Sequence, residues 1–289
     1  MYPSRFDYES PKTIKDAIGL LEASGGNAKV LAGGQSLVPM LKLRFAFPEQ
    51  LVDINNIPGL DYITFDADGT LRIGALVRHE HLEKSAEIKK RQPTISAAAP
   101  LVADPIVRAR GTFVGSVCHA DPQGDWAATM IALNGSMIVE GPKGRRTIAM
   151  KDFVLGPYAN AMASNEIAIE AVIPAPKGVA RGGYLKLERR VGDFATASVA
   201  VALDMSGDTV LSAGFALAGV GGKTIDANDA ASALVGKKLT EATIAECAAL
   251  VAAKAEPRTD HRGSSDYKRH IVETFVKRIL TANSTQKAA

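Results

Sequence analysis

The sequence predicts an α+β fold in two domains, and three observations lead to that prediction. At 289 residues the chain is longer than one hydrophobic core usually supports. Strand-like and helix-like segments mix irregularly in the first part, whereas strands come first and helices follow in the second. Both patterns favour α+β over a doubly wound sheet. Between them "VIPAPKGVARGG" is rich in proline and glycine, so we predict domains 1–175 and 176–289, with the junction near Pro174 to Lys177.

The first 55 residues are expected to alternate between helix and strand. A helix is predicted to begin with Ser10 as its N-cap and Pro11 at its first position, and to end at Gly25-Gly26. "AKVLA" and "QLVDIN" are typical of short buried strands. Between them lies a helix capped by Ser36, with Pro39 in its first turn, where a missing N–H costs little.

The middle of the chain contains one strong turn signal and one ambiguous stretch. Asp68-Gly69 between "YITF" and "LRIGAL" predicts a tight β-hairpin. The stretch "RARGTFVGSVCHADPQGDWAATMIALNG" is expected to run from a β-prone segment through small residues into a helix that Asp121, Pro122 and Asp125 open. Trp126 is expected in the core or in an interface.

The last third predicts a hairpin followed by helices. "ATASVAVALDM" and "TVLSAGFALAGV" flank Ser206-Gly207-Asp208 and indicate an antiparallel pair. Helices are predicted near residues 227–234, 240–255 and 265–280 from their apolar periodicity. The polar tail from Asn283 is expected to fray.

Composition narrows the class of protein. Hydrophobic residues make up 46% and charged residues 22%, which is ordinary for a soluble globular protein. The net charge of +3 arises from interspersed basic and acidic residues, so neither nucleic acid nor an anionic membrane is expected as a partner. No stretch approaches the roughly 20 apolar residues of a membrane span, and the first residues do not resemble a signal peptide. A cytoplasmic location is therefore expected.

The two cysteines, Cys118 and Cys247, indicate no disulfide framework. An ordinary iron–sulfur cluster needs four thiolates, so any such cluster is expected on another chain. Cys118, His119 and Asp121 are residue types of a catalytic triad, but neighbours on an extended stretch point apart. His79 and His81 lack a third metal ligand nearby, so no metal site is predicted.

The candidate binding residues lie in two bends of the chain that contain glycine. A strand that leads through Gly33-Gly34 into a helix exposes unpaired N–H groups, which favours a phosphate or pyrophosphate. The spacing matches neither G-x-G-x-x-G nor G-x-x-x-x-G-K-[ST], so this bend alone is equally compatible with a structural turn. At the second bend Thr112 and Ser116 offer hydroxyls. Asp125 could bind a ribose hydroxyl or, alternatively, could only stabilise the start of its helix.

Several motifs together carry a family resemblance. "FDYESPKTIKDAIGLL", "LAGGQSLVPMLKLR", "RGTFVGSVCHADPQGD" and "GGYLKLERRVGDFATASVAVAL" occur in the order typical of the FAD-binding medium subunit of molybdenum hydroxylases. The chain resembles this carbon monoxide dehydrogenase and xanthine dehydrogenase family over almost its whole length. The resemblance implies an FAD-binding domain of the vanillyl-alcohol oxidase (PCMH) type, in two α+β lobes split near residue 57. A smaller C-terminal flavoprotein domain of antiparallel sheet plus helices follows.

The resemblance also assigns the contacts to a non-covalently bound FAD. The first loop comprises Lys29, Val30, Leu31, Ala32, Gly33, Gly34, Gln35, Ser36 and Leu37, and the second comprises Thr112, Phe113, Val114, Gly115 and Ser116. Asp125 is expected at the ribose, Lys186 beside the flavin ring, where a solvated strand lysine is the alternative, and Phe194 against the isoalloxazine. Val114 stands where the family has glycine, and Ser116 where it has asparagine. Because a β-branched residue does not readily take φ > 0, we expect Val114 to be extended or its backbone shifted.

The function implied is that of an electron-transfer subunit of an oxidoreductase. In this family a small subunit with [2Fe–2S] clusters receives electrons from a large molybdopterin subunit, and the flavin subunit delivers them to an acceptor. The expected assembly is a dimer of heterotrimers, with molybdopterin and [2Fe–2S] only on the partners and no catalytic residue on this chain. A stand-alone FAD-dependent oxidase or dehydrogenase and a non-catalytic assembly module are the alternatives. The substrate and the electron acceptor stay open.

Overall fold

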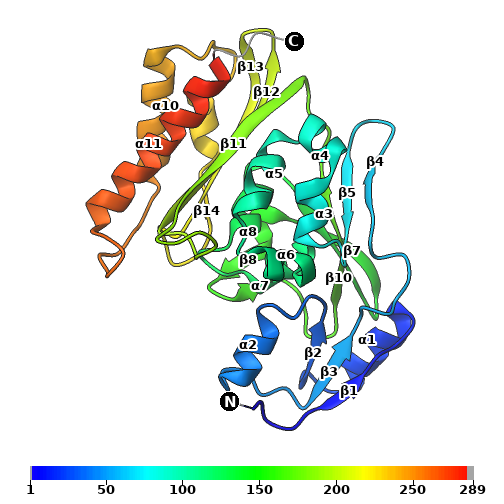
Figure 1. The fold of residues 1–289 in the computed structure, drawn as a ribbon. Helices are drawn as coiled ribbons and strands as arrows, with labels where there is room; N and C mark the ends of the chain where they lie inside the picture. The colour runs from blue at the N-terminus through cyan, green and yellow to red at the C-terminus, as the bar shows by residue number, and fades with distance from the viewer. Residues whose placement is uncertain (1, 285–289) are drawn as a thin grey trace.

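The structure, a computed structural model, describes residues 2–284 and has the predicted α+β architecture. Within these residues, short helices pack around separate sheets of three, five and four strands, with one additional two-stranded pair. Figure 1 shows the three-stranded sheet at one end of the molecule and the four-stranded sheet with the last two helices at the other. The five-stranded sheet lies between them.

The first lobe is a small parallel sheet with two helices. Its strands are, in spatial order, β1 (Asp7–Glu9), β3 (Gln50–Asp53) and β2 (Ala28–Leu31), and its helices are α1 (Ile14–Ala23) and α2 (Leu37–Lys42). Both strands predicted here, "AKVLA" and "QLVDIN", are confirmed. The predicted N-cap of α1 is wrong by three residues, because the Thr13 hydroxyl accepts the Asp16 N–H at 3.1 Å and the helix begins there.

The second lobe is built on an antiparallel sheet. Its strands are, in order, β4 (Ile63–Phe65), β5 (Leu71–Gly74), β10 (Ile167–Ile173), β6 (Ser136–Gly141) and β7 (Gly144–Ala149). The hairpin predicted at Asp68-Gly69 joins β4 to β5, and Gly69 adopts φ of 94° in its turn. The split predicted near residue 57 lies between β3 and β4.

Short helices and one small strand pair fill the rest of the second lobe. They are α3 (His79–Lys84), α4 (Ala86–Arg91), α5 (Pro93–Ala98), η1 (Ala99–Leu101), α6 (Pro105–Arg110), α7 (Phe113–His119), α8 (Asp125–Ala132), α9 (Met150–Phe153), β8 (Val154–Gly156) and β9 (Ala159–Asn160). The β-prone segment predicted before the second bend is therefore wrong. Asp104 and Thr112 each accept a backbone N–H with the side chain, and these two caps start α6 and α7.

The C-terminal part is an antiparallel sheet covered by helices. Its strands are, in order, β11 (Val179–Leu187), β12 (Ala197–Ser206), β13 (Thr209–Ala218) and β14 (Ile225–Asp226), followed by η2 (Asn228–Ala233), α10 (Glu241–Ala253) and α11 (Ser265–Ser284). The β12–β13 hairpin and the helices α10 and α11 are confirmed, whereas the segment near residue 230 is a 3-10 helix. Asn283 is buried inside α11, so fraying from Asn283 is wrong. Residues 285–289 of the predicted tail lie outside the described part.

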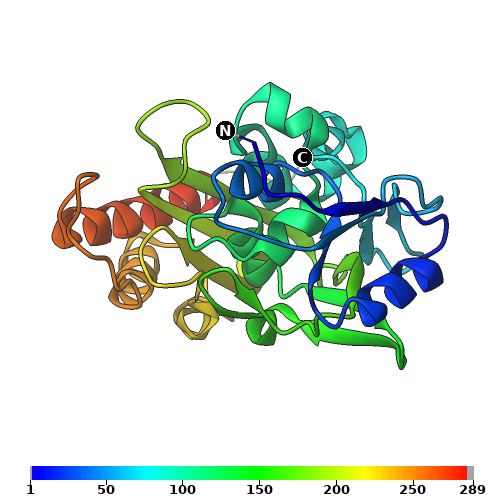
Figure 2. The same ribbon diagram turned by 90° about the horizontal axis from the view of Figure 1, so that it is seen from below.

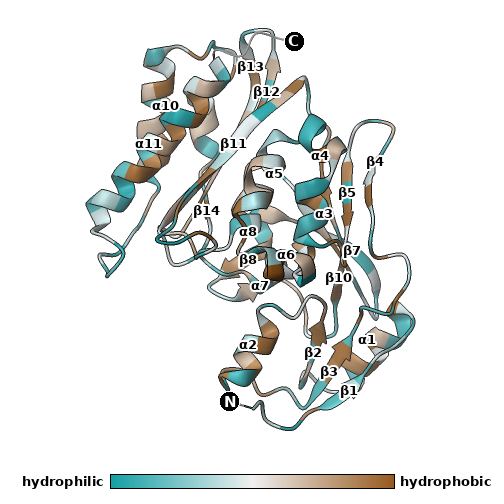
Figure 3. Ribbon diagram, viewed as in Figure 1, coloured by the Kyte–Doolittle hydropathy of each residue, from teal (hydrophilic) through white to brown (hydrophobic). Residues whose placement is uncertain are grey.

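The four-stranded sheet separates two hydrophobic cores. Along β12, Val199, Val201 and Leu203 face α10 and α11, and the alternate residue Ala200 packs with the second lobe, as the two-residue period of a strand requires. Figure 3 shows the apolar stretches along the strands and on the inner faces of the helices. In the described residues no helix is long and apolar enough to cross a bilayer. The predicted domain boundary near Pro174 to Lys177 stays a prediction; it falls between β10 and β11.

Candidate functional site

A cavity of about 670 Å³ lies where the two lobes and the β11–β12 loop meet. Figure 2 shows this loop extending from the sheet as a yellow-green segment. Most of the predicted FAD contacts line the cavity: Lys29, Val30, Ala32, Gly33, Gly34, Gln35, Ser36, Leu37, Thr112, Val114, Gly115, Ser116, Asp125 and Phe194. Leu31, Phe113 and Lys186 are the predicted contacts outside this lining. The fold thus gathers residues from three distant segments around one space of a size usual for cofactor pockets.

The two glycine bends touch each other through the main chain. A Cβ at Gly33 would lie 2.6 Å from the Arg110 carbonyl oxygen and 2.7 Å from the Gly111 Cα. Only glycine therefore allows this approach. Its neighbour Gly34 is needed for a different reason, since it adopts φ of 74°. The bend beginning at Gly33 and the bend beginning at Gly111 form one continuous wall.

Backbone N–H groups of this wall are left without partners. Within residues 2–284 no hydrogen bond is made by the N–H groups of Gly33, Gly34, Gln35, Ser36, Thr112 and Val114. Ser36 occupies the N-cap position of α2 but its side chain makes no capping bond, contrary to the prediction. Unpaired N–H donors beside a cavity are suited to an anion such as a diphosphate.

Val114 is not extended, so that expectation is wrong, and the shifted backbone expected as its alternative stays a prediction. It lies in the first turn of α7, where φ is negative as for any helical residue, and its side chain is buried. The Thr112 hydroxyl accepts the Gly115 N–H at 3.2 Å and starts the helix. The second bend is therefore a helix start that needs no positive φ at residue 114.

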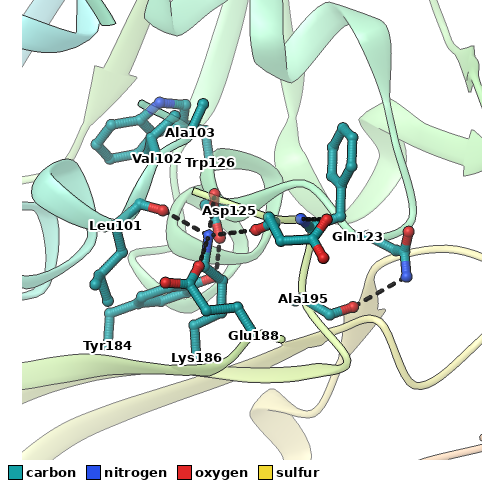
Figure 4. Close-up of polar contacts among 12 residues, drawn as sticks. Leu101, Val102, Ala103, Gln123, Asp125, Trp126, Tyr184, Lys186, Glu188 and Ala195 are labelled. Atoms are coloured by element: carbon teal, nitrogen blue, oxygen red, sulfur yellow. Dashed lines mark hydrogen bonds and ion pairs between the residues drawn. The ribbon is translucent and has the colours of Figure 1, made fainter. Parts of the chain in front are cut away.

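A buried charged cluster adjoins the other end of the cavity. Tyr184 donates to Asp125 Oδ1 at 2.6 Å, and the Lys186 ammonium lies 3.4 Å from Asp125 Oδ2 and 3.2 Å from Glu188 Oε2. Lys186 also donates to the carbonyl oxygens of Leu101 and Asp193. Figure 4 shows these side chains converging on the ammonium.

The Lys186 side chain is only 1% exposed, so the alternative of a solvated lysine is wrong. Burial raises the pKa of the Asp125 carboxyl, and the Lys186 ammonium and the Tyr184 hydroxyl oppose that shift. Glu188 Oε2 is buried and, apart from the ion pair, makes no hydrogen bond within the described residues. The Lys186 ammonium thus pairs with two carboxylates, and its contacts connect α8, η1 and the β11–β12 loop.

Phe194 lies beside the charged cluster, in the β11–β12 loop with Gly192 and Asp193, whose carbonyl accepts a hydrogen bond from Lys186. Phe194 is 52% exposed and lines the cavity. Gly192 approaches the Ala103 carbonyl so closely that a Cβ would lie 2.9 Å from its oxygen. The loop is thereby seated on the segment before α6, with the aromatic ring available to a ligand.

His79 is a cavity residue that the sequence did not assign to the site. It is 4% exposed, and its Nδ1 accepts the indole N–H of Trp126 at 2.9 Å. Burial, with Arg108 and Arg78 nearby, lowers the pKa of His79 to about 4. The imidazole is therefore neutral near pH 7 and carries its proton on Nε2. Trp126 is fully buried, as predicted for a core residue.

The segment from Tyr158 to Ala168 also lines the cavity, although the sequence did not predict it there. Asn160 donates to the Cys118 carbonyl at 2.7 Å and joins this segment to α7. The sequence signal for it is weak: Gly156-Pro157 marks a turn, but nothing indicates what the turn packs against.

Other chemistry at the cavity finds no support in the geometry. Cys118 and His119 lie in α7, so the extended stretch expected there is wrong, and burial raises the pKa of the Cys118 thiol to about 12. His79 and His81 lie in α3. Within residues 2–284 no group of three or more His, Cys, Asp or Glu side chains could hold a metal ion.

Comparisons with known proteins identify the family. Residues 4–176 match the family described as "FAD binding domain in molybdopterin dehydrogenase", and residues 183–282 match "CO dehydrogenase flavoprotein C-terminal domain". The predicted fold, an FAD-binding domain of the PCMH type followed by a C-terminal flavoprotein domain, is thereby confirmed.

Individual relatives are similar over nearly the whole chain. The carbon monoxide dehydrogenase medium chain of Hydrogenophaga pseudoflava is 41% identical over 98% of both chains, and the glyceraldehyde dehydrogenase medium chain of Sulfolobus acidocaldarius is 34% identical over 95% of this chain and 97% of its own. A solved structure of the Hydrogenophaga pseudoflava carbon monoxide dehydrogenase superposes with a TM-score of 0.94 at 42% identity, covering both chains completely. The chain belongs to the family of FAD-binding medium subunits of molybdopterin-dependent dehydrogenases.

Proposed function

We propose that this chain binds FAD in the cavity between its lobes, takes electrons from a [2Fe–2S] subunit and passes them to an external acceptor. The observation that supports the proposal best is the wall formed by the two bends, where six cavity-lining residues have backbone N–H groups without a hydrogen-bond partner in residues 2–284. Such a wall suits the diphosphate of FAD, because N–H donors satisfy an anion that water would otherwise solvate.

The residues present fit the cofactor at both ends of the cavity. The glycines leave room for a diphosphate to approach the main chain, and Lys29 adds a positive charge to the lining. Asp125 has a carboxylate that accepts hydrogen bonds, which suits a ribose hydroxyl. Phe194 offers an aromatic face on the rim. The roles of Lys29, Asp125 and Phe194 are part of the proposal.

For Lys186 we propose a role in addition to the expected place beside the flavin ring, which stays a prediction. Because its ammonium is buried among oxygens of Asp125, Glu188 and two carbonyls, we propose that it orients Asp125 and the β11–β12 loop. When bound, FAD supplies redox chemistry that accepts and releases electrons, while the protein controls its position and electrostatic surroundings. Substrate oxidation belongs to a partner subunit in this proposal, and no catalytic residue is assigned on this chain.

The partners follow from the relatives that carry the name "medium chain". We propose a small [2Fe–2S] subunit, a large molybdopterin subunit and a dimer of the resulting heterotrimers. One relative is named for carbon monoxide and another for glyceraldehyde, so the flavin subunit does not determine the substrate. The cytoplasmic location stays a prediction that fractionation of native cells tests.

Purification of the chain alone and with its partners tests the proposal. The isolated chain is expected to carry close to one FAD per polypeptide and to leave substrates unchanged until the partners are added. Rapid mixing of the oxidised complex with a substrate of the large subunit should then show FAD reduction following cluster reduction. Turnover by the isolated chain would favour a stand-alone flavoenzyme, and a colourless chain that cannot be reconstituted with FAD would favour an assembly module.

A further inference from the structure

A chain of side-chain hydrogen bonds connects the two bends. Asn55, just after β3, donates from Nδ2 to the Ala32 carbonyl at 2.8 Å. Arg78 donates from Nη2 to Asn55 Oδ1 at 2.7 Å and from Nη1 to the Arg110 carbonyl at 2.6 Å. Ala32 immediately precedes Gly33, and Arg110 immediately precedes Gly111. The hydrogen-bonded side chains of Asn55 and Arg78 therefore link the Ala32 carbonyl, before the first bend, to the Arg110 carbonyl, before the second.

The link is anchored at both ends. In the first lobe, Asp53 Oδ1 accepts Asn55 Nδ2 at 2.6 Å, and Asp53 Oδ2 accepts the Tyr8 hydroxyl at 2.6 Å. In the second lobe, the backbone around Arg78 pairs with the second bend, because the His79 N–H donates to the Gly111 carbonyl at 3.0 Å. The Arg78 side chain is thus the part that crosses from one lobe to the other.

Neither Arg78 nor Asn55 lines the cavity. The Arg110 carbonyl that Arg78 holds is the same atom that a Cβ at Gly33 would meet. The link therefore acts where the bends touch and can influence a ligand only through the main chain on either side.

We propose that Arg78 and Asn55 are positioning residues that fix the separation of the two bends, so that both can bind the diphosphate of one FAD. This inference rests on the proposed function, since it concerns how the same cavity binds FAD. An arginine suits the task because its planar fork reaches two acceptors in fixed directions, whereas a lysine ammonium is a point charge on a flexible stem. In the described residues Arg78 forms no salt bridge, and both of its side-chain hydrogen bonds belong to the link.

The test measures the dissociation constant of FAD for the full chain by fluorescence titration. Arg78→Ala and Asn55→Ala are each expected to weaken binding about ten- to a hundredfold, and Arg78→Lys by about tenfold or less. Because both side chains belong to one link, the double variant should be no more than about threefold weaker than Arg78→Ala. The visible circular dichroism of FAD at saturation should change in Arg78→Ala and return toward the wild-type spectrum in Arg78→Lys.

Arg91→Ala is the matched control, because Arg91 belongs to the same lobe but stacks on Phe65 away from the bends. It should bind FAD as the wild type does. Unchanged FAD affinity in Arg78→Ala, or single effects that multiply in the double variant, would overturn the inference alone. If Arg78→Ala does not fold, Arg78→Lys and Asn55→Ala decide in the same way. A wild-type chain that binds no FAD would instead overturn the proposed function.

Discussion

The two ends of the cavity are built by opposite means. At the bends, the main chain at Gly33 contacts the main chain at Gly111, and this contact is possible only because Gly33 has no side chain. At the other end, the side chains of Asp125, Lys186 and Glu188 are buried together, and the structure depends on the ion pairs between them. The first end should not tolerate added atoms, and the second should not tolerate a lost charge. Each end can be tested with a change that the other would survive.

The largest expected effect is the loss of the cation from the charged end. Lys186→Met keeps the length of the side chain but leaves Asp125 and Glu188 without their shared partner. Because an unpaired buried charge is costly, we expect the free energy of unfolding to fall by about 3–5 kcal/mol. Urea denaturation of the full chain measures it. Adding Asp125→Asn should restore part of the loss, since it removes one of the two charges, and a loss below about 1 kcal/mol would show that the cluster is well solvated.

The next effect comes from adding atoms at the bends. Gly33→Val places a Cβ against the Arg110 carbonyl and the Gly111 Cα, and because both are backbone atoms, neither can move cheaply. We expect FAD affinity to fall by a hundredfold or more, equivalent to about 3 kcal/mol. FAD retained per chain after gel filtration measures the change. Gly19→Ala is the control, because nothing lies within 4 Å of its added Cβ; equal FAD retention in both variants would contradict the contact between the bends.

The third effect depends on pH and concerns His79, which lines the cavity. Burial lowers the pKa of His79 to about 4, while an unfolded histidine titrates near 6.5. The unfolded chain therefore binds the proton first as the pH falls. The stability contributed by neutral His79 is complete above pH 6.5 and is lost progressively toward pH 4, by up to about 3 kcal/mol.

Unfolding free energies between pH 4 and 7 check this prediction. His79→Gln should flatten the curve in that window, because its amide can still accept the Trp126 indole N–H but does not titrate there. His261→Gln removes an exposed histidine and should leave the curve unchanged. A wild-type curve that is already flat between pH 4 and 6.5 would contradict the burial of a neutral imidazole.

Local signals in the sequence predicted much of the fold. Asp68-Gly69 and Ser206-Gly207-Asp208 determine their hairpins through the turn itself, so both could be predicted without knowledge of the partner strands. Helices α6 and α7 were missed because six and seven residues carry too little periodicity, and short helices depend on tertiary packing. The local signals for them were the caps Asp104 and Thr112 and, in α6, Pro105 at the first helical position.

The part of the site that is formed by the main chain could be predicted from the sequence. The part formed by side chains from distant segments was harder to predict. The family resemblance placed Gly33 and Thr112 in loops that do line one cavity. In contrast, Arg78 and Asn55 are 23 residues apart and meet only after the lobes pack. The resemblance singled out Lys186, but the enclosure of its ammonium by Asp125 and the Leu101 carbonyl is a tertiary property.

The smallest effect distinguishes a helix cap from a ligand contact at the second bend. Thr112→Val removes the hydroxyl that accepts the Gly115 N–H, so the start of α7 should lose about 1 kcal/mol of stability. Thr112→Ser keeps the hydroxyl and should lose only a few tenths of that amount. Thermal melting without FAD measures the cap alone, and the further shift on adding FAD measures the ligand contact. If Thr112→Val melts like the wild type without FAD but loses the shift, the hydroxyl serves the cofactor rather than the helix, and the second bend would then resemble the charged end in depending on a side chain.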